Sequence, residues 1–64
     1  MDISKAKVGK KVYDKWYWLE WGPGTIKKVL KTRIYVKFQN RSEIDRFDIP
    51  TARQYLEFGL MPKN

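Results

Sequence analysis

The side chains best suited to recognition chemistry are aromatic, and they cluster between positions 13 and 21 of this 64-residue sequence. Five of its ten aromatic residues lie within these nine positions. A core of this size cannot bury them all, because neighbours in an extended segment point to opposite sides. We therefore expect one or two rings to stay partly exposed, where they stack on bases or anchor a protein partner. The candidate binding residues are Trp16, Tyr17, Trp18 and Trp21. An alternative role for Trp16 and Trp21 is that of large lids over one end of the core.

A second candidate group is cationic. The first 37 residues hold ten Lys or Arg against three acidic residues, an excess equal to the whole net charge of +7. A one-sided positive field attracts polyanions, because it raises their encounter rate. Two predicted strands and their turn carry the candidate residues Lys27, Lys28, Lys31, Arg33, Tyr35 and Lys37. Cations contact phosphates and a ring contacts bases, so this group predicts a nucleic-acid surface. Exposed lysines also discourage edge pairing of strands, and that alternative stays open.

Catalytic and metal chemistry fit the sequence poorly. It contains no His and no Cys, which excludes imidazole and thiolate nucleophiles, zinc sites built from them, and disulfides. Ser4 and Ser42 have no basic partner in the sequence pattern. Asp45 and Asp48 are three positions apart on a predicted strand, so they lie on opposite faces and form no carboxylate pair. We expect a binding module that is not an enzyme and that holds no metal and no cofactor.

The elements that must position these residues are short strands. Alternation is cleanest at 33–38, and further strands are predicted at 8–14, 25–30, 43–49 and 55–58. An aromatic-rich connection is expected at 15–22, a two-residue turn at 31–32, and a helical or 3-10 turn at 51–54 capped by Thr51. This order predicts an all-β fold, a five-stranded antiparallel SH3-like barrel with one short helical turn before the last strand. The predicted core consists of Val8, Val12, Ile26, Ile34, Val36, Phe38, Phe47 and Leu56.

The length allows a single domain, with an expected ordered core at about 7–59 and a frayed tail at 61–64. The N-terminal residues lack the apolar region of a secretory signal, and no apolar run approaches the roughly 20 residues that cross a bilayer. We therefore expect a cytoplasmic protein without a membrane partner.

Three segments resemble a known group of domains. They are Val8-Gly9-Lys10-Lys11-Val12, Trp21-Gly22-Pro23-Gly24-Thr25-Ile26 and Val36-Lys37-Phe38. They are similar to the VGxxV…(W/F)GxGxV…VxF pattern of bacterial Tudor-like, SH3-like domains, found at the C-terminus of UvrD/PcrA-type helicases and as short stand-alone proteins. The resemblance covers roughly residues 8–58. It implies a five-stranded barrel and, in the helicase examples, contact with RNA polymerase or nucleic acid.

Two functions follow as hypotheses. The first is binding of DNA or RNA through the basic ribbon and the exposed aromatic residues. The alternative is a protein-interaction module that docks on RNA polymerase or another protein of the transcription or repair machinery. An aromatic cage for a methylated cation uses the same rings, but the neighbouring positive charge would repel such a ligand.

Overall fold

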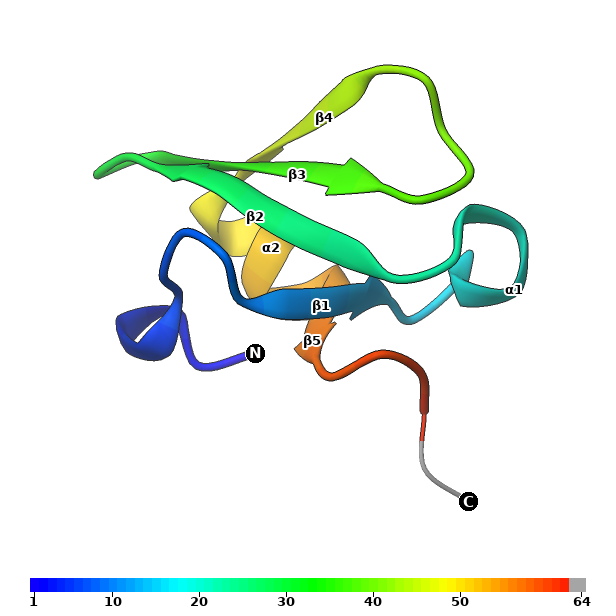
Figure 1. Cartoon of the computed structure of the whole chain (residues 1–64). Helices are drawn as coiled ribbons and strands as arrows, with labels where there is room; N and C mark the ends of the chain where they lie inside the picture. The colour runs from blue at the N-terminus through cyan, green and yellow to red at the C-terminus, as the bar shows by residue number, and fades with distance from the viewer. Residues whose placement is uncertain (63–64) are drawn as a thin grey trace.

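The computed structural model describes residues 1–62, so the expected tail at 61–64 lies partly outside the described residues. The elements in chain order are η1 (Ile3–Lys5), β1 (Lys11–Asp14), α1 (Trp18–Trp21), β2 (Gly24–Val29), β3 (Arg33–Phe38), β4 (Ile44–Asp48), α2 (Ile49–Tyr55) and β5 (Leu56–Phe58) (Figure 1). The strands form one antiparallel sheet in the order β4-β3-β2-β1-β5. The predicted antiparallel five-stranded sheet and the helical turn before the last strand are confirmed.

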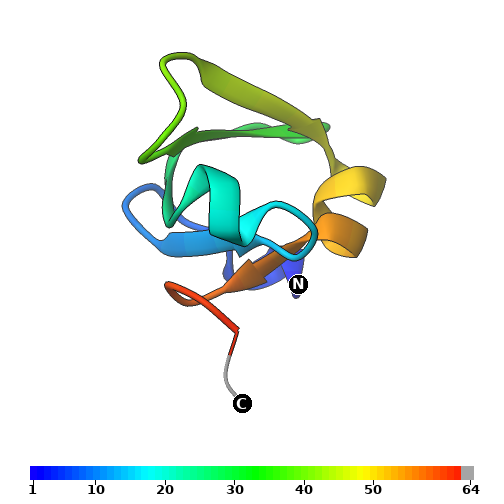
Figure 2. The ribbon, with the colours of Figure 1, turned by 90° about the vertical axis from the view of Figure 1, so that its right-hand side faces the viewer.

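The sheet curls but does not close into a complete barrel. Among residues 1–62, no backbone pairing joins the edge strands β4 and β5. Helix α2 packs against β3, β4 and β5 and lies between the two edges (Figure 2). A helix therefore covers the side of the core that strand pairing would cover in a closed barrel.

The core lies inside this curl. On β3, Ile34, Val36 and Phe38 are buried while the alternate residues face outward, as the two-residue period of a strand requires. Seven of the eight predicted core residues are buried; Val8 is the exception, with 67% of its surface exposed. Ala52 on α2 is also buried and completes the core. Val8 is exposed because Gly9, with φ +94°, turns the chain there and delays the start of β1 until Lys11.

The helix before the last strand is longer than predicted. It begins at Ile49, which the sequence placed at the end of the fourth strand, and Pro50 occupies its first turn. Proline fits this position because the first amide donors of a helix have no partner within the helix. The N-cap is therefore Asp48, and the prediction of Thr51 as the cap was wrong.

The first residues of the chain pack beneath the core. Asp2 accepts hydrogen bonds from the amide and the hydroxyl of Ser4, which lower the pKa of its carboxyl. The Met1 ammonium donates to the Arg53 carbonyl at 2.9 Å, and Met1 and Ile3 pack against the core. Within residues 1–62, no helix has both the length and the apolar character that a membrane span needs.

Candidate nucleic-acid interface

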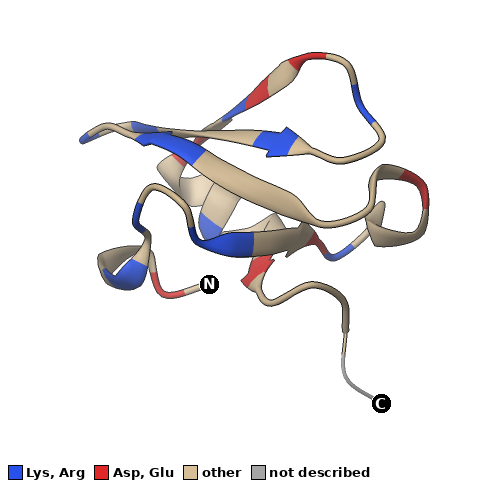
Figure 3. Cartoon of the chain, in the orientation of Figure 1, with Lys and Arg blue, Asp and Glu red and all other residues tan. Residues whose placement is uncertain are grey.

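The outer side of the sheet carries a concentration of cationic residues, which we call the basic face. Its members project from β1, β2, β3, β4 and the β2–β3 turn: Lys11, Lys27, Lys28, Lys31, Arg33, Tyr35, Lys37 and Arg46. Figure 3 shows Lys and Arg at the end of β2 and in the turn that joins it to β3. Strand pairing thus brings Lys28, Arg33, Tyr35 and Lys37 together on one side of the sheet. Of the other two predicted residues, Lys27 lies in a concavity with Lys37, and Lys31 lies in the turn.

A β-bulge accounts for the density of charge on β2. The register shifts between Ile26, which pairs with Val36, and Lys28, which pairs with Tyr35. A regular strand would send Lys27 and Lys28 to opposite faces, whereas the extra residue of a bulge lets both lie on the outer face. The sequence did not predict this bulge. In a regular strand, side chains alternate between the two faces, so only one of the two lysines was expected to face outward.

The basic face is hollowed at its β1–β3 end. A shallow concavity of about 340 Å³ is lined by Lys11, Thr25, Lys27 and Lys37, together with Pro23, Gln39 and Leu60. The Lys11 ammonium donates to the Thr25 hydroxyl at 2.6 Å, which fixes one cation at its edge. Three ammonium groups around one concavity are suited to a phosphate, because each is a compact positive charge with three donors.

Most cations of the basic face have no carboxylate partner. Within residues 1–62, the two ion pairs are Lys15–Glu57 at 3.8 Å and Arg41–Asp45 at 2.6 Å. Neither pair contains a residue of the basic face. Asp48 stands opposite Arg33 in the β3–β4 ladder but forms no ion pair with it, so no carboxylate of residues 1–62 is in direct contact with these cations and they remain available to an anionic partner.

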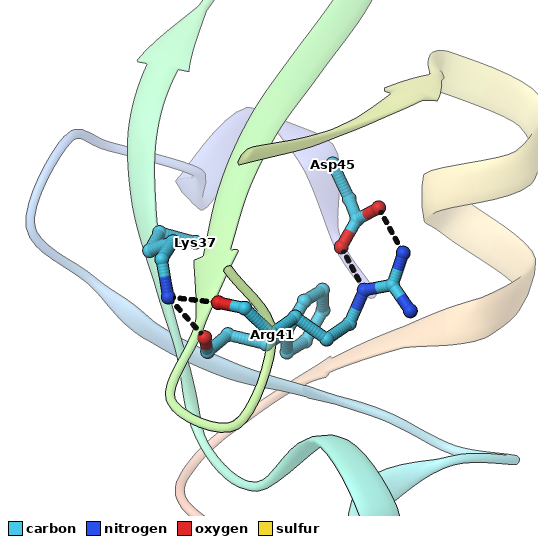
Figure 4. A network of polar contacts seen from close by, with 4 residues as sticks. Lys37, Arg41 and Asp45 are labelled. Atoms are coloured by element: carbon cyan, nitrogen blue, oxygen red, sulfur yellow. Dashed lines mark hydrogen bonds and ion pairs between the residues drawn. The ribbon is translucent and has the colours of Figure 1, made fainter. Parts of the chain in front are cut away.

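Lys37 differs from the other lysines of the face. Its ammonium donates to the carbonyl of Phe38, the last residue of β3, at 2.7 Å, and to the carbonyl of Arg41 in the turn that follows (Figure 4). Arg41 in turn holds Asp45 through two hydrogen bonds of 2.6 and 2.9 Å. Lys37 thus contributes charge to the concavity while its donors stabilise the turn.

Tyr35 occupies the centre of a row that crosses three strands. It pairs with Lys28 on β2 and with Arg46 on β4. A hydrogen bond with Arg33, followed by the charges of Arg33 and Arg46, lowers the pKa of the Tyr35 hydroxyl. Arg46 was not predicted, although the alternation of β4 around Phe47 pointed it outward; its place beside Tyr35 depends on the β3–β4 register.

The aromatic segment, residues 15–22, forms a turn and the short helix α1, where the sequence predicted only a connection. The buried carboxylate of Asp14 organises it by accepting the amides of Trp16 at 2.8 Å and Tyr17 at 3.1 Å. Gly22, with φ +71°, ends the helix. A side-chain acceptor at the start of a turn satisfies amides that no strand partner reaches.

The rings of this segment divide into a lid and an exposed pair. Trp21 packs on Phe38 at 5.2 Å between centroids, and the Arg41 guanidinium lies 4.4 Å from its ring centre. Tyr17 stacks on Trp21 at 4.5 Å but keeps 46% of its surface exposed. Trp16 is 70% exposed and meets Tyr55 edge to face. The alternative role as a lid is confirmed for Trp21, while Trp16 stays open to solvent; Trp18, the first residue of α1, is half-buried.

The aromatic segment and the basic face are separate surfaces. Trp16 and Tyr17 line a concavity of about 400 Å³ with Asp14, Gln54 and Tyr55, and this lining contains no Lys or Arg. It shares no residue with the lysine concavity. Tyr35 is therefore the one predicted aromatic residue that the structure brings beside the predicted cations. The sequence missed Gln54 and Tyr55, because nothing local connects them with position 16.

Within residues 1–62, no three side chains of His, Cys, Asp or Glu come together in an arrangement that could hold a metal ion. Comparisons with protein-family models, with curated proteins and with solved structures find no significant match to this chain.

Proposed function

We propose that this protein is a non-enzymatic nucleic-acid-binding module whose basic face contacts the phosphate backbone. The observation that carries the proposal is that, within residues 1–62, no cation of the basic face forms an ion pair, although Asp48 stands opposite Arg33. Lysines that only keep a protein soluble can be distributed over its whole surface. Here a bulge and three paired strands collect them on one side of the sheet.

The arrangement suits backbone contacts more than base reading. Lysine ammonium groups neutralise phosphates and release their counterions, which supplies affinity without sequence preference. Lys27, Lys28 and Lys31 are exposed and project from a backbone that strand pairing holds in place. When these lysines bind phosphates, the backbone that carries them therefore loses little conformational entropy.

We infer that the fold is an open relative of the SH3-like, Tudor-like barrels that the sequence resembles. The meander of β1 to β4 and the helical turn before β5 follow the order of those barrels. Because of this resemblance, the partners to test first are DNA, RNA and proteins of the transcription and repair machinery.

The test measures, by fluorescence anisotropy at two salt concentrations, the binding of labelled DNA and RNA oligonucleotides to the protein. Each phosphate contact on a duplex should add about 0.9 to the slope of log affinity against log salt. The triple variant Lys27→Gln, Lys28→Gln, Lys31→Gln should lower that slope by about 2 to 3. The matched control is Lys5→Gln, Lys7→Gln, Lys15→Gln, which removes the same charge outside the basic face and should bind nearly as the unaltered protein does.

No binding to any oligonucleotide at low salt would overturn the proposal. Equal losses in the two triple variants would assign the affinity to net charge instead of to the basic face.

A second candidate function, docking on a protein, is favoured by the exposure of the aromatic segment. Trp16 is 70% and Leu19 76% exposed, and single exposed aromatic residues next to a concavity are common anchors of protein interfaces. The partner suggested by the resemblance is RNA polymerase or another protein of the transcription or repair machinery.

Purified bacterial RNA polymerase is the probe for this second function. Binding should survive moderate salt and weaken at least about tenfold in Trp16→Ala, as is typical of an interface anchor. The lysine triple variant serves as the control and should bind the polymerase unchanged. Absence of binding by the unaltered protein would remove this polymerase from the candidates.

A further inference from the structure

The geometry of the β2–β3 hairpin points to double-stranded DNA as the ligand, with the tip of the hairpin lying in the major groove. This inference rests on the proposed nucleic-acid function and specifies the form of nucleic acid and the element that enters it. It is carried by the charge, the rigidity, the width and the exposed apolar residues of the tip, and by the position of the aromatic segment.

The tip, residues 27–33, carries four cations and no acidic residue. They are Lys27, Lys28, Lys31 and Arg33. Arg33 stands opposite Asp48 in the β3–β4 ladder, yet no ion pair links them. Figure 1 shows the turn between β2 and β3 projecting past β1 and β4. Lys31 lies in this turn, while Arg33 and Lys28 lie in rows that also include β4.

Two backbone hydrogen bonds hold the turn of the tip in place. The Leu30 amide donates to the Arg33 carbonyl at 2.8 Å and closes the turn around Lys31 and Thr32. The Ile49 amide donates to the Thr32 carbonyl at 3.1 Å and ties the turn to the start of α2. A projecting hairpin that is already ordered enters a groove with little entropic cost.

The width of the hairpin selects the groove. β4 pairs with β3 as far as Arg33, so the part of the tip that is two strands wide is the turn from Leu30 to Thr32. Its two backbone segments lie about 4.8 Å apart, and their side chains extend the ribbon further on each side. The major groove of B-form DNA is about 12 Å wide and admits a two-stranded ribbon, while the minor groove is about 6 Å wide and does not. The major groove of an RNA duplex is deep and narrow, which excludes the same ribbon.

Apolar side chains at the tip provide a second, independent indication. Val29 and Leu30 are 37% and 39% exposed, although cations flank them on both sides. Val29 pairs with the buried Ile34 and therefore lies on the core side of the sheet, so Leu30 is the apolar residue of the tip that is available beside the cations. In the major groove, the 5-methyl group of thymine is an apolar feature for such side chains to contact.

Single-stranded nucleic acid fits this face less well. Binding of single strands relies on aromatic side chains along the path of the backbone, each of which stacks on a base. The exposed rings of Trp16 and Tyr17 line a concavity that has no residue of the basic face. Tyr35 alone offers a ring between the cations of the basic face, where Lys28 and Arg46 are its strand partners.

The first experiment compares a short DNA duplex, either of its single strands, and an RNA duplex of the same sequence by anisotropy in one buffer. We expect the DNA duplex to bind at least about tenfold more tightly than the other two. Equal or tighter binding of a single strand or of the RNA duplex would overturn this inference and leave the proposed function intact. Loss of binding to all of them would instead defeat the proposed function.

The second experiment tests the groove. A duplex with uracil in place of thymine lacks the 5-methyl group and should bind about two- to fivefold more weakly. Leu30→Ser should weaken binding to the thymine duplex by a similar factor and remove the difference between the two duplexes. Leu19→Ser, on the exposed side of α1, is the matched control and should change neither affinity. Folding of both variants is checked by circular dichroism. Equal binding of the two duplexes by the unaltered protein would overturn the placement of Leu30 in the major groove.

Discussion

The basic face and the aromatic segment differ in how many contacts their side chains make within the protein. In the aromatic segment, Asp14 holds the backbone, and Trp21 is enclosed by Phe38, Tyr17 and Arg41. On the basic face, strand pairing holds the backbone, but within residues 1–62 the cations have no carboxylate partners.

This difference separates residues that stabilise the fold from residues whose charges are available to a partner. Aromatic residues that pack together contribute buried area to a small core, which needs it because a chain of this length buries only roughly 60% of its unfolded surface. Unpaired cations on a rigid sheet do not stabilise the fold, because like charges in proximity repel. The packed rings of the aromatic segment therefore add to the stability that the core supplies, and the basic face is the surface at which we propose that binding takes place.

The largest change in the free energy of unfolding is expected at Gly24, which packs against the core residues Val36 and Phe38 of β3. Gly24 begins β2 and is buried, and a Cβ atom there would come within 2.7 Å of Val36 and 2.8 Å of Phe38. Gly24→Ala should lower the free energy of unfolding by about 1–3 kcal/mol, because the core cannot move away from the added carbon. Urea unfolding measures the loss. Unchanged stability would show that Val36 and Phe38 can rearrange, contrary to the packing described.

A smaller effect separates two tryptophans of the aromatic segment. Trp21→Ala should cost about 2 kcal/mol, below the range for fully buried aromatic residues because Trp21 is half-buried. Trp16→Ala should cost less than about 0.5 kcal/mol, as is usual for an exposed side chain. Thermal and urea unfolding of the two variants provide the comparison. Equal losses would contradict the division of this segment into a lid and an exposed ring.

The smallest effect concerns the titration of Tyr35. Because Arg33 and Arg46 favour the phenolate, its pKa lies below the ordinary value of a tyrosine, and Arg33→Gln should raise it. Bound phosphates should also raise it, since they offset the two guanidinium charges. The difference in ultraviolet absorbance between the protein and Tyr35→Phe isolates this titration. Arg41→Gln is the control, because Asp45 engages Arg41 away from Tyr35. A Tyr35 pKa that does not respond to Arg33→Gln would contradict the arrangement of this row.

Local pattern was sufficient for much of the fold. The boundaries of β3 match the prediction because apolar and polar residues alternate from Arg33 to Phe38 without interruption. The start of β1 and the start of α2 were misplaced, because each depends on backbone geometry at Gly9 or Pro50 that a hydrophobic pattern does not encode. The closed barrel was an extrapolation from strand number, and the open sheet reflects the place that α2 occupies.

The sequence by itself determined the mainly β character of the fold, most of the core and the concentration of charge in the first 37 residues, because these follow from residue type and a two-residue period. Only the tertiary structure decided which side chains became neighbours. The bulge placed Lys27 and Lys28 on one face, the β3–β4 register brought Arg46 to Tyr35, and Asp14 turned Trp16 toward Tyr55. Strand register and the direction of a turn depend on contacts between distant residues, which no local pattern contains.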